Sequence, residues 1–324
     1  MDIVIYFENG LGIKSSLVIE NKVKSLPRYE QLLNYTTSNM EENYLLLSLT
    51  KPSFLAKNNK IVIHEHNRDW DYINYFHLSK MLEKILPKIK VKNFYHALII
   101  EDYIHFAKIL NDLSEEVYNT AINGKYNFYN KQNKKISLLR TIRMHDFYLK
   151  LNHEVLAIEI QNRIQTELSN KVLVQGNRRT NAVDQEVFAD SGFTRGSGIT
   201  EIKYVIGRKL GSPIILGIQI QGIHFRLFIE GKKGFVEKAA YNLLDNNMWF
   251  DFSYLSDSIL FADKEYPNKP GKQFNSYSEE FYYRSVKLSE CKCRDLVDKV
   301  LNYVKYIHDE RESLIQQINE ISIE

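Results

Sequence analysis

The chain opens with two short apolar runs separated by a turn-rich segment, and this pattern constrains the fold most. The runs are 3–7, IVIYF, and 17–19, LVI, and both are rich in β-branched and aromatic residues. Asn9, Gly10 and Gly12 supply turn residues between them. Apolar runs of this kind on either side of an Asn-Gly turn predict an antiparallel β-hairpin.

The hairpin would bring charged side chains together at its open end. If its turn is centred on Leu11, Asp2 lies opposite Glu20, with their Cβ atoms roughly 5 Å apart. Side chains alternate along a strand, so Lys22 shares the face of Glu20 and Asn21 points to the other face. Two facing carboxylates repel, and a cation, a shared proton or the lysine must offset this repulsion. Oxygen ligands suit a hard cation such as Mg²⁺ or Mn²⁺.

A segment with helical character follows Pro27 and carries Gln31 and Tyr35. These two residues are four apart, so they lie on one helix face, where both can hydrogen-bond phosphate oxygens. An apolar segment over 41–49 then predicts another strand. A solvated hairpin end with an ordinary Glu–Lys pair is the alternative, because Glu-x-Lys occurs by chance in most chains of this length. The downstream Gln-x-x-x-Tyr favours a functional site.

Asp2, Glu20-x-Lys22 and Gln31-x-x-x-Tyr35 together resemble the motifs of the PD-(D/E)XK nuclease superfamily, in its RecB-like and lambda-exonuclease-like branches. The resemblance covers the first third of the chain, and the order strand, strand, helix, strand matches the central part of that core. It implies an α/β fold, with a restriction-endonuclease-like mixed sheet core flanked by helices and a C-terminal α+β region. Members usually have a helix and a strand before the motif aspartate. Either the natural start lies upstream of this one or the chain lacks those elements.

The resemblance also implies a function. It indicates a metal-dependent nuclease that hydrolyses phosphodiester bonds of DNA, leaving 5′-phosphate ends, with Mg²⁺ or Mn²⁺ as cofactor. Asp2, Glu20 and the Asn21 carbonyl would hold the metal, Lys22 would complete the catalytic set, and Gln31 and Tyr35 would bind the substrate. Two alternatives are a catalytically silent nucleic-acid-binding relative and an interaction subunit of a bacterial defence or repair complex. The sequence leaves open DNA against RNA and endonuclease against exonuclease.

A second Asp…Glu-x-Lys set, Asp190, Glu201 and Lys203, lies further along the chain. We rank it behind the first set. No apolar strand leads cleanly into Asp190, and no Gln-x-x-x-Tyr helix follows.

The composition changes over residues 123–135, which are rich in Asn, Lys and Tyr and make the best linker candidate. We therefore expect a nuclease-like core over 1–122 and a helical, then strand-rich region over 136–324. Lys84, Lys88, Lys90 and Lys92 form a solvated face unless they meet backbone phosphates. The other expected elements are strands at 59–66, 171–175, 200–208, 213–221 and 223–230, a strand or cap at 249–252, and helices at 69–86, 97–113, 136–168, 234–245 and from 288 to the end.

Composition narrows the class of protein. The 43 basic and 40 acidic residues are too balanced to indicate nucleic-acid binding by themselves, so any basic surface must come from local clustering. Cys291 and Cys293, two residues apart on an expected helix, should be reduced thiols. We find no signal peptide and no apolar run of membrane-spanning length. Plentiful Lys, Asn and Ile indicate an AT-rich bacterial gene, and we expect a cytoplasmic protein.

The first strand has apolar side chains on both faces. Ile3, Ile5 and Phe7 lie on one, and Val4 and Tyr6 on the other. Such a strand belongs inside a sheet with both faces covered, because soluble monomers rarely expose contiguous apolar patches. We expect residues 171–230, the C-terminal helix or a second copy in a homodimer to provide the cover.

Overall fold

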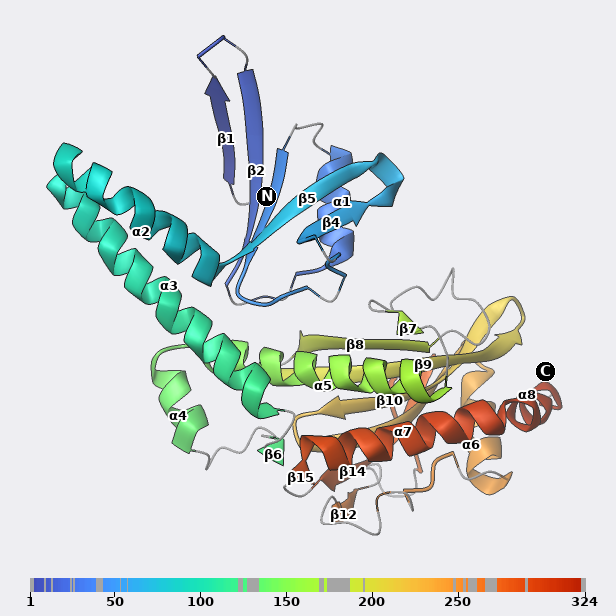
Figure 1. Cartoon of the computed structure of the whole chain (residues 1–324). Coiled ribbons are helices and arrows are strands. Elements are labelled where there is room, and N and C mark those ends of the chain that lie inside the picture. Colours follow the sequence, from blue (N-terminus) through green and yellow to red (C-terminus); the bar gives the residue numbers. More distant parts are fainter. Residues whose placement is uncertain are drawn as a thin grey trace. The chain divides into compact units, whose positions relative to one another are not determined.

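The computed structural model describes residues 3–8, 10–12, 14–23, 25, 27–38, 43–52, 54–56, 58–121, 125–126, 134–168, 172–173, 187–194, 196–246, 249–252, 255, 261–265, 273–288 and 291–321. The chain divides into two compact units, Met1–Val117 and Tyr118–Glu324. Both combine helices with β-sheet, and the expected α/β class is confirmed (Figure 1). The division falls inside a helix, just before the segment 123–135, most of which lies outside the described residues.

Unit 1 is built on a mixed sheet. Its strands lie in the order β1 (Ile3–Glu8), β2 (Lys14–Lys22), β3 (Asn43–Ser48), β5 (Arg68–Asn74) and β4 (Lys60–Ile63). The outer pairs, β1–β2 and β4–β5, are antiparallel, whereas β2–β3 and β3–β5 are parallel. A parallel pair needs a crossover connection, and α1 (Tyr29–Ser38) supplies it between β2 and β3.

The predicted hairpin and its register are confirmed. Ile3 pairs with Ile19 and Ile5 with Leu17, as a turn centred on Leu11 requires. Asp2, which the sequence places opposite Glu20, lies outside the described residues.

The core of unit 1 forms between α1 and one face of the sheet. Val18, Leu46 and Trp70 are fully buried from three different strands, and Leu32 of α1 packs against them. The Trp70 indole Nε1 donates to Thr36 Oγ1 at 2.9 Å, so the buried N–H has a partner. This packing holds α1 over the segment of β2 that carries the acidic and basic side chains.

The predicted helix over 69–86 is wrong in its first part. Residues up to Asn74 belong to β5, in which Trp70 pairs with Ile61, and burial of this residue in the sheet overrides the apparent helical spacing. The helix α2 (Tyr75–Lys92) begins only after Asn74, whose side chain caps it by accepting from the His77 N–H at 2.8 Å. The expected strand over 59–66 likewise ends at Ile63.

A strand that continued to residue 66 would place His64 and His66 on one face, but β4 ends before them. Residues His64–His66 form a 3₁₀ turn, and the next residue, Asn67, has a positive φ of 49°. This turn reverses the chain into β5, so the two imidazoles do not share a strand face.

The two long helices of unit 1 follow each other closely. A single residue, Asn93, separates α2 from α3 (Phe94–Ala121), and Figure 1 shows the two helices side by side, extending from the sheet. The expected helix over 97–113 is confirmed within α3. Among the described residues, no helix is long and apolar enough to cross a membrane.

The apolar face of β1 is open among the described residues of unit 1. Ile3, Ile5 and Phe7 expose 48%, 43% and 46% of their surface, and within the described part of unit 1 no element lies over them. In the described sheet, β1 is also one of the two edge strands and pairs only with β2.

Unit 2 contains a large sheet with the order β12-β14-β11-β10-β9-β8-β7, and β13 also pairs with β14. Only the short pair β7–β8 is parallel among the described pairs of this sheet. Its strands are β7 (Val172–Leu173), β8 (Val187–Thr194), β9 (Ser197–Lys209), β10 (Ser212–Gln221), β11 (His224–Glu230), β12 (Phe261–Glu265), β13 (Asn275–Ser278) and β14 (Phe281–Leu288). A separate short pair joins β6 (Lys125–Tyr126) to β15 (Cys291–Lys292).

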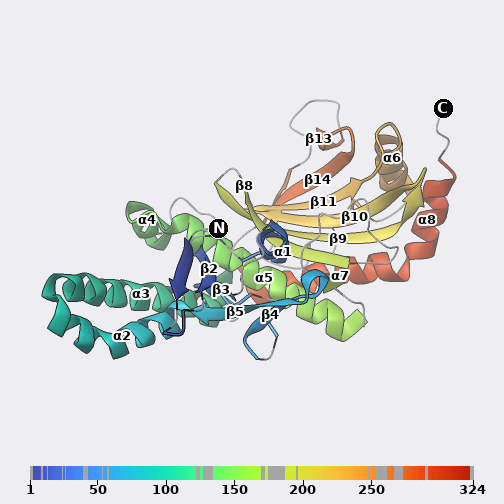
Figure 2. The ribbon, with the colours of Figure 1, turned by 90° about the horizontal axis from the view of Figure 1, so that it is seen from above.

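Helices cover one face of this sheet, as Figures 1 and 2 show. They are α5 (His145–Leu168), α6 (Val236–Asn246), α7 (Cys293–Asp309) and α8 (Arg311–Asn319), and all four contribute buried side chains to the main core. The short helix α4 (Lys134–Thr141) packs against α5. The opposite face carries a smaller apolar cluster with Phe188, Phe228 and Phe281, together with polar side chains.

Several sequence predictions for unit 2 hold. Helices over 136–168 and strands over 200–208, 213–221 and 223–230 are confirmed, and Gly222 has the positive φ of 57° that the turn between β10 and β11 needs. The single C-terminal helix is wrong, because Glu310 interrupts it between α7 and α8. Cys291 lies in a strand, and both cysteines are buried free thiols, as expected.

Candidate functional site

The acidic and basic residues of β2 form a buried ion pair. The Glu20 carboxylate contacts Lys22 Nζ, and the two residues expose 1% and 9% of their surface. They lie two apart on the strand and so point to the same face, the one that α1 covers. A buried ion pair of this kind costs desolvation energy and therefore needs further hydrogen bonds to be stable.

Gln31 of α1 supplies such a hydrogen bond. Its Nε2 donates to Glu20 Oε1 and to Tyr35 Oη, both at 2.9 Å. An amide nitrogen has two hydrogens, so both bonds are made at once and fix the orientation of the side chain. The helix thus joins the charged pair of β2 to the Tyr35 hydroxyl in one hydrogen-bonded chain. The structure brings Glu20, Lys22, Gln31 and Tyr35 together.

Asn21 points away from this group. Its Oδ1 accepts a hydrogen bond of 2.5 Å from the Tyr75 hydroxyl, at the start of α2. Its side chain therefore anchors α2 on the far face of the sheet, and only its main-chain carbonyl stays a candidate ligand. No local signal marks Tyr75 in the sequence, since 54 residues separate the two partners.

The described residues supply few metal ligands. No group of three or more His, Cys, Asp or Glu side chains in the described part of the chain could hold a metal ion. At the unit 1 site Glu20 offers one carboxylate, which is paired with Lys22. Hard oxygen donors of this type suit Mg²⁺ or Mn²⁺, but a cation would have to share the carboxylate with the lysine.

The second acidic and basic set lies in unit 2. Contrary to the sequence analysis, a regular strand, β8, carries Asp190, which pairs directly with Glu201 of β9. Lys203 Nζ contacts the carboxylates of Glu201 at 3.2 Å and Glu230 at 3.0 Å. Burial alone lowers the pKa of Lys203, but the two carboxylates outweigh this effect and raise it above its usual value. Gln219 Nε2 also donates to Glu201 Oε1 at 3.0 Å.

This polar network continues across the sheet. Arg226 Nη1 donates to Gln219 Oε1 at 2.6 Å and to Gln221 Oε1 at 2.7 Å, and its guanidinium lies over the rings of Tyr277 and Tyr283. Each charged group therefore meets an opposite charge or a hydrogen-bond partner from a neighbouring strand. Such mutual pairing is typical of a structural network that holds strands in register.

Two titratable residues of α5 are buried near the same strands. Burial lowers the pKa of His153 to about 3, and its Nδ1 lies 2.9 Å from Thr200 Oγ1. Burial raises the pKa of Glu154 to about 8, although the Tyr118 hydroxyl, which donates to it at 3.0 Å, lowers it, and the charge of Asp190 raises it further. Both groups are thus neutral near pH 7. No short sequence motif marks either residue.

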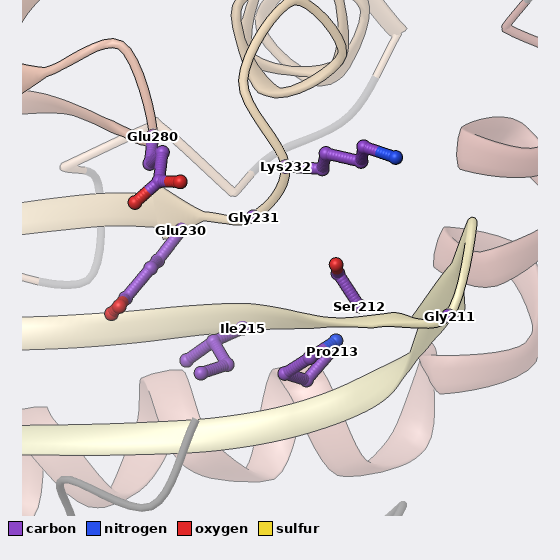
Figure 3. A pocket seen from close by; sticks show the side chains of 8 residues that line it. All are labelled: Gly211, Ser212, Pro213, Ile215, Glu230, Gly231, Lys232 and Glu280. Carbon is purple, nitrogen blue, oxygen red and sulfur yellow. The ribbon is translucent and has the colours of Figure 1, made fainter. Parts of the chain in front are cut away.

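A pocket of about 400 Å³ lies at one end of the unit 2 sheet. Figure 3 shows Ser212, Lys232, Glu230 and Glu280 around it, with Ile215 beside them. Its lining mixes both signs of charge, and the Glu230 carboxylate is already engaged by Lys203. None of the residues that we selected from the sequence lines this pocket.

Comparison of the chain with models of known protein families, with curated proteins and with solved structures finds no match.

The buried pair of unit 1 can be tested by its effect on stability. Lys22→Met would leave the Glu20 carboxylate buried without its cation, at an expected cost of about 3–5 kcal/mol in the free energy of unfolding. The double variant Glu20→Gln/Lys22→Met should recover part of this loss, because neither charge remains. Urea unfolding of the wild type, Lys22→Met, Glu20→Gln and the double variant gives the coupling energy.

The control for this cycle is Lys14→Met, at the exposed end of the same strand. Its effect should stay within about 0.5 kcal/mol. A comparably small effect of Lys22→Met would contradict the buried pair.

The raised pKa of Glu154 predicts a pH-dependent stability. Unfolded, this carboxyl loses its proton near its ordinary pKa of 4.5, whereas in the fold it keeps the proton up to about pH 8. Stability should therefore fall as the pH rises from 4.5 to 8. Glu154→Gln removes this loss, and the variant should gain a few kcal/mol over the wild type across that window.

Thermal or urea unfolding at the two ends of the window measures the gain. Glu312→Gln, at an exposed position of α8, is the control. An equal difference between Glu154→Gln and wild type at both pH values would show that Glu154 is not held neutral.

Proposed function

We propose that unit 1 is a nuclease of the PD-(D/E)XK type that hydrolyses phosphodiester bonds of DNA with the help of Mg²⁺ or Mn²⁺. The observation that carries the proposal is the Gln31 side chain, which links Glu20 of the Glu-x-Lys pair to Tyr35. Hairpin, helix and parallel strand follow each other in the order that the motif resemblance implies. The proposal includes Asp2, which lies outside the described residues.

In this proposal the metal, when bound, would polarise the scissile phosphate and acidify a water molecule. Glu20, the Asn21 carbonyl and Asp2 would hold it. Lys22, beside Glu20, would orient the attacking water and stabilise negative charge that develops on the phosphate. Gln31 and Tyr35 would orient the substrate backbone, with their present hydrogen bond exchanged for bonds to phosphate oxygens.

A second candidate is a catalytically silent nucleic-acid-binding relative. This candidate is favoured by the small number of acidic ligands at the site. Among the described residues, only the Glu20 carboxylate lies there, and it is paired with Lys22. Such a protein would bind DNA without cleaving it. An interaction subunit of a bacterial defence or repair complex is a further alternative, in which a partner strand pairs with the edge of β1.

Cleavage of labelled duplex and plasmid DNA with Mg²⁺ or Mn²⁺ tests the proposal. Glu20→Gln should lower the rate by about 100-fold or more, because it removes a catalytic charge while keeping the shape of the side chain. The matched control is Glu201→Gln, which makes the same change in the unit 2 set and should keep the activity. Calorimetry with Mn²⁺ on wild type and Asp2→Ala should show that Asp2 contributes to metal binding.

The outcomes separate the candidates. Activity that survives Glu20→Gln and disappears in Glu201→Gln would move the site to unit 2. Binding of DNA without any cleavage by the wild type would favour the silent relative.

A further inference from the structure

The exposed side of α2 carries a row of lysines. Lys80, Lys84, Lys88 and Lys92 are each four residues apart, and all four are exposed. Residues with this spacing lie along one side of a helix, with a rise of about 6 Å from one to the next. The row therefore presents regularly spaced positive charges along most of the helix. We call these four residues the lysine row.

Positive charge is concentrated on this helix. Residues 75–92 contain five lysines and one glutamate, whereas the remainder of unit 1 contains nine basic and fourteen acidic residues. The near-neutral balance of the whole chain hides this segregation. A cationic helix on an otherwise acidic unit attracts anions to one place rather than to the whole surface.

Most of the row has no acidic partner in the described structure. Lys80 contacts Glu83 at 3.1 Å, and the second oxygen of Glu83 is taken by Lys108. Among the described residues, no carboxylate lies within ion-pair distance of Lys84, Lys88 or Lys92. Like charges at this spacing weakly destabilise a helix, so the row is unfavourable for α2 alone. An anionic ligand would remove this repulsion.

Aromatic side chains stand at the end of the row. Phe94 and Tyr95, at the start of α3, expose 59% and 69% of their surface. Lys90, a further lysine of α2 outside the row, places its Nζ 5.7 Å from the centre of the Phe94 ring, so this ring also has a cation beside it. Exposed rings beside a row of cations are the elements with which proteins hold single-stranded nucleic acid, by stacking bases while cations meet phosphates.

The layout of α2 favours nucleic acid over a membrane surface. Lys84 lies near the middle of the exposed side, opposite the buried Tyr75 and Ser79, while Met81 and Ile85 lie on one flank. A helix that lies in a membrane interface has an apolar face at its centre and its lysines on the polar side. On α2 the lysines lie at the centre of the exposed side, together with the exposed Met81 and Val91, and no continuous apolar face is centred there.

The helix that carries the row begins beside β2, the strand of the candidate site, on the opposite face of the sheet from Glu20 and Lys22. Tyr75, the first residue of α2, donates to Asn21, which lies between Glu20 and Lys22 on β2. The helix then runs about 27 Å away from that point. A nucleic acid strand that follows the row would therefore lead toward β2.

We propose that the lysine row, with Phe94 and Tyr95, is a binding surface for single-stranded nucleic acid. The lysines contact successive phosphates, and the two rings stack on unpaired bases. This inference rests on the proposed function, because that function identifies the ligand as nucleic acid. Binding to the surface itself requires neither metal nor cleavage.

Fluorescence anisotropy with a labelled single-stranded 30-mer in EDTA tests this surface on the full chain. Lys84→Gln/Lys88→Gln/Lys92→Gln should weaken binding at least tenfold and should reduce the slope of log affinity against log salt by about 2, because each lost phosphate contact removes about 0.7. The control is Lys14→Gln/Lys232→Gln/Lys292→Gln, which removes three exposed charges elsewhere and should change both values little.

Phe94→Ala/Tyr95→Ala should weaken binding several-fold with the salt slope unchanged, because stacking carries no charge.

An unchanged affinity and slope in the lysine variant, or an equal loss in the control, would overturn the proposal. So would binding of the wild type to phosphatidylserine vesicles but not to the oligonucleotide, which would make the row a membrane surface. Glu20→Gln separates the two proposals, since it should abolish cleavage and leave this binding intact. If the wild type does not cleave DNA but the lysine row binds it, the proposed nuclease fails and the binding surface stands.

Discussion

The removal of the Glu20 carboxylate from water is the constraint on which unit 1 depends. A carboxylate that is 1% exposed is stable only if a cation and hydrogen bonds replace its lost hydration, and these come from Lys22 and Gln31. Gln31 can reach it only because α1 lies over β2, held there by Leu32 in the core. The charged pair therefore depends on the crossover helix α1 and on the parallel strand that follows it.

The sequence predicted those parts of the fold whose signals are local. The turn residues between the two apolar runs indicated the β1–β2 register, and β9, β10 and β11 of the second sheet followed from their β-branched runs. It failed where burial in a sheet competes with helical spacing, as at Trp70, and where a strand carries polar residues, as β8 does. Neither failure could be corrected without knowing the neighbouring strands.

At the candidate site, too, the sequence predicted what local signals determine and missed what distant residues determine. Glu20, Lys22, Gln31 and Tyr35 were found because short motifs place them on one strand face and one helix face. The contacts of Asn21 with Tyr75 and of Lys203 with Glu230 join residues that are far apart in sequence, and no spacing rule reaches them. The neutral state of Glu154 likewise depends on burial by elements around α5, which the sequence does not rank.

The exposed edge of β1 has a consequence for how this chain behaves in concentrated solution. Residues 3–7, IVIYF, combine high β-propensity with the absence of charge and proline, the composition of segments that add strands to one another and aggregate. Acidic residues, Asp2 and Glu8, stand at both ends of this segment in the sequence. Charges that flank an apolar strand oppose its aggregation, because stacking identical strands would bring like charges together. The nuclease proposal also assigns one of these two carboxylates, Asp2, to the metal, so the same side chain would serve both purposes.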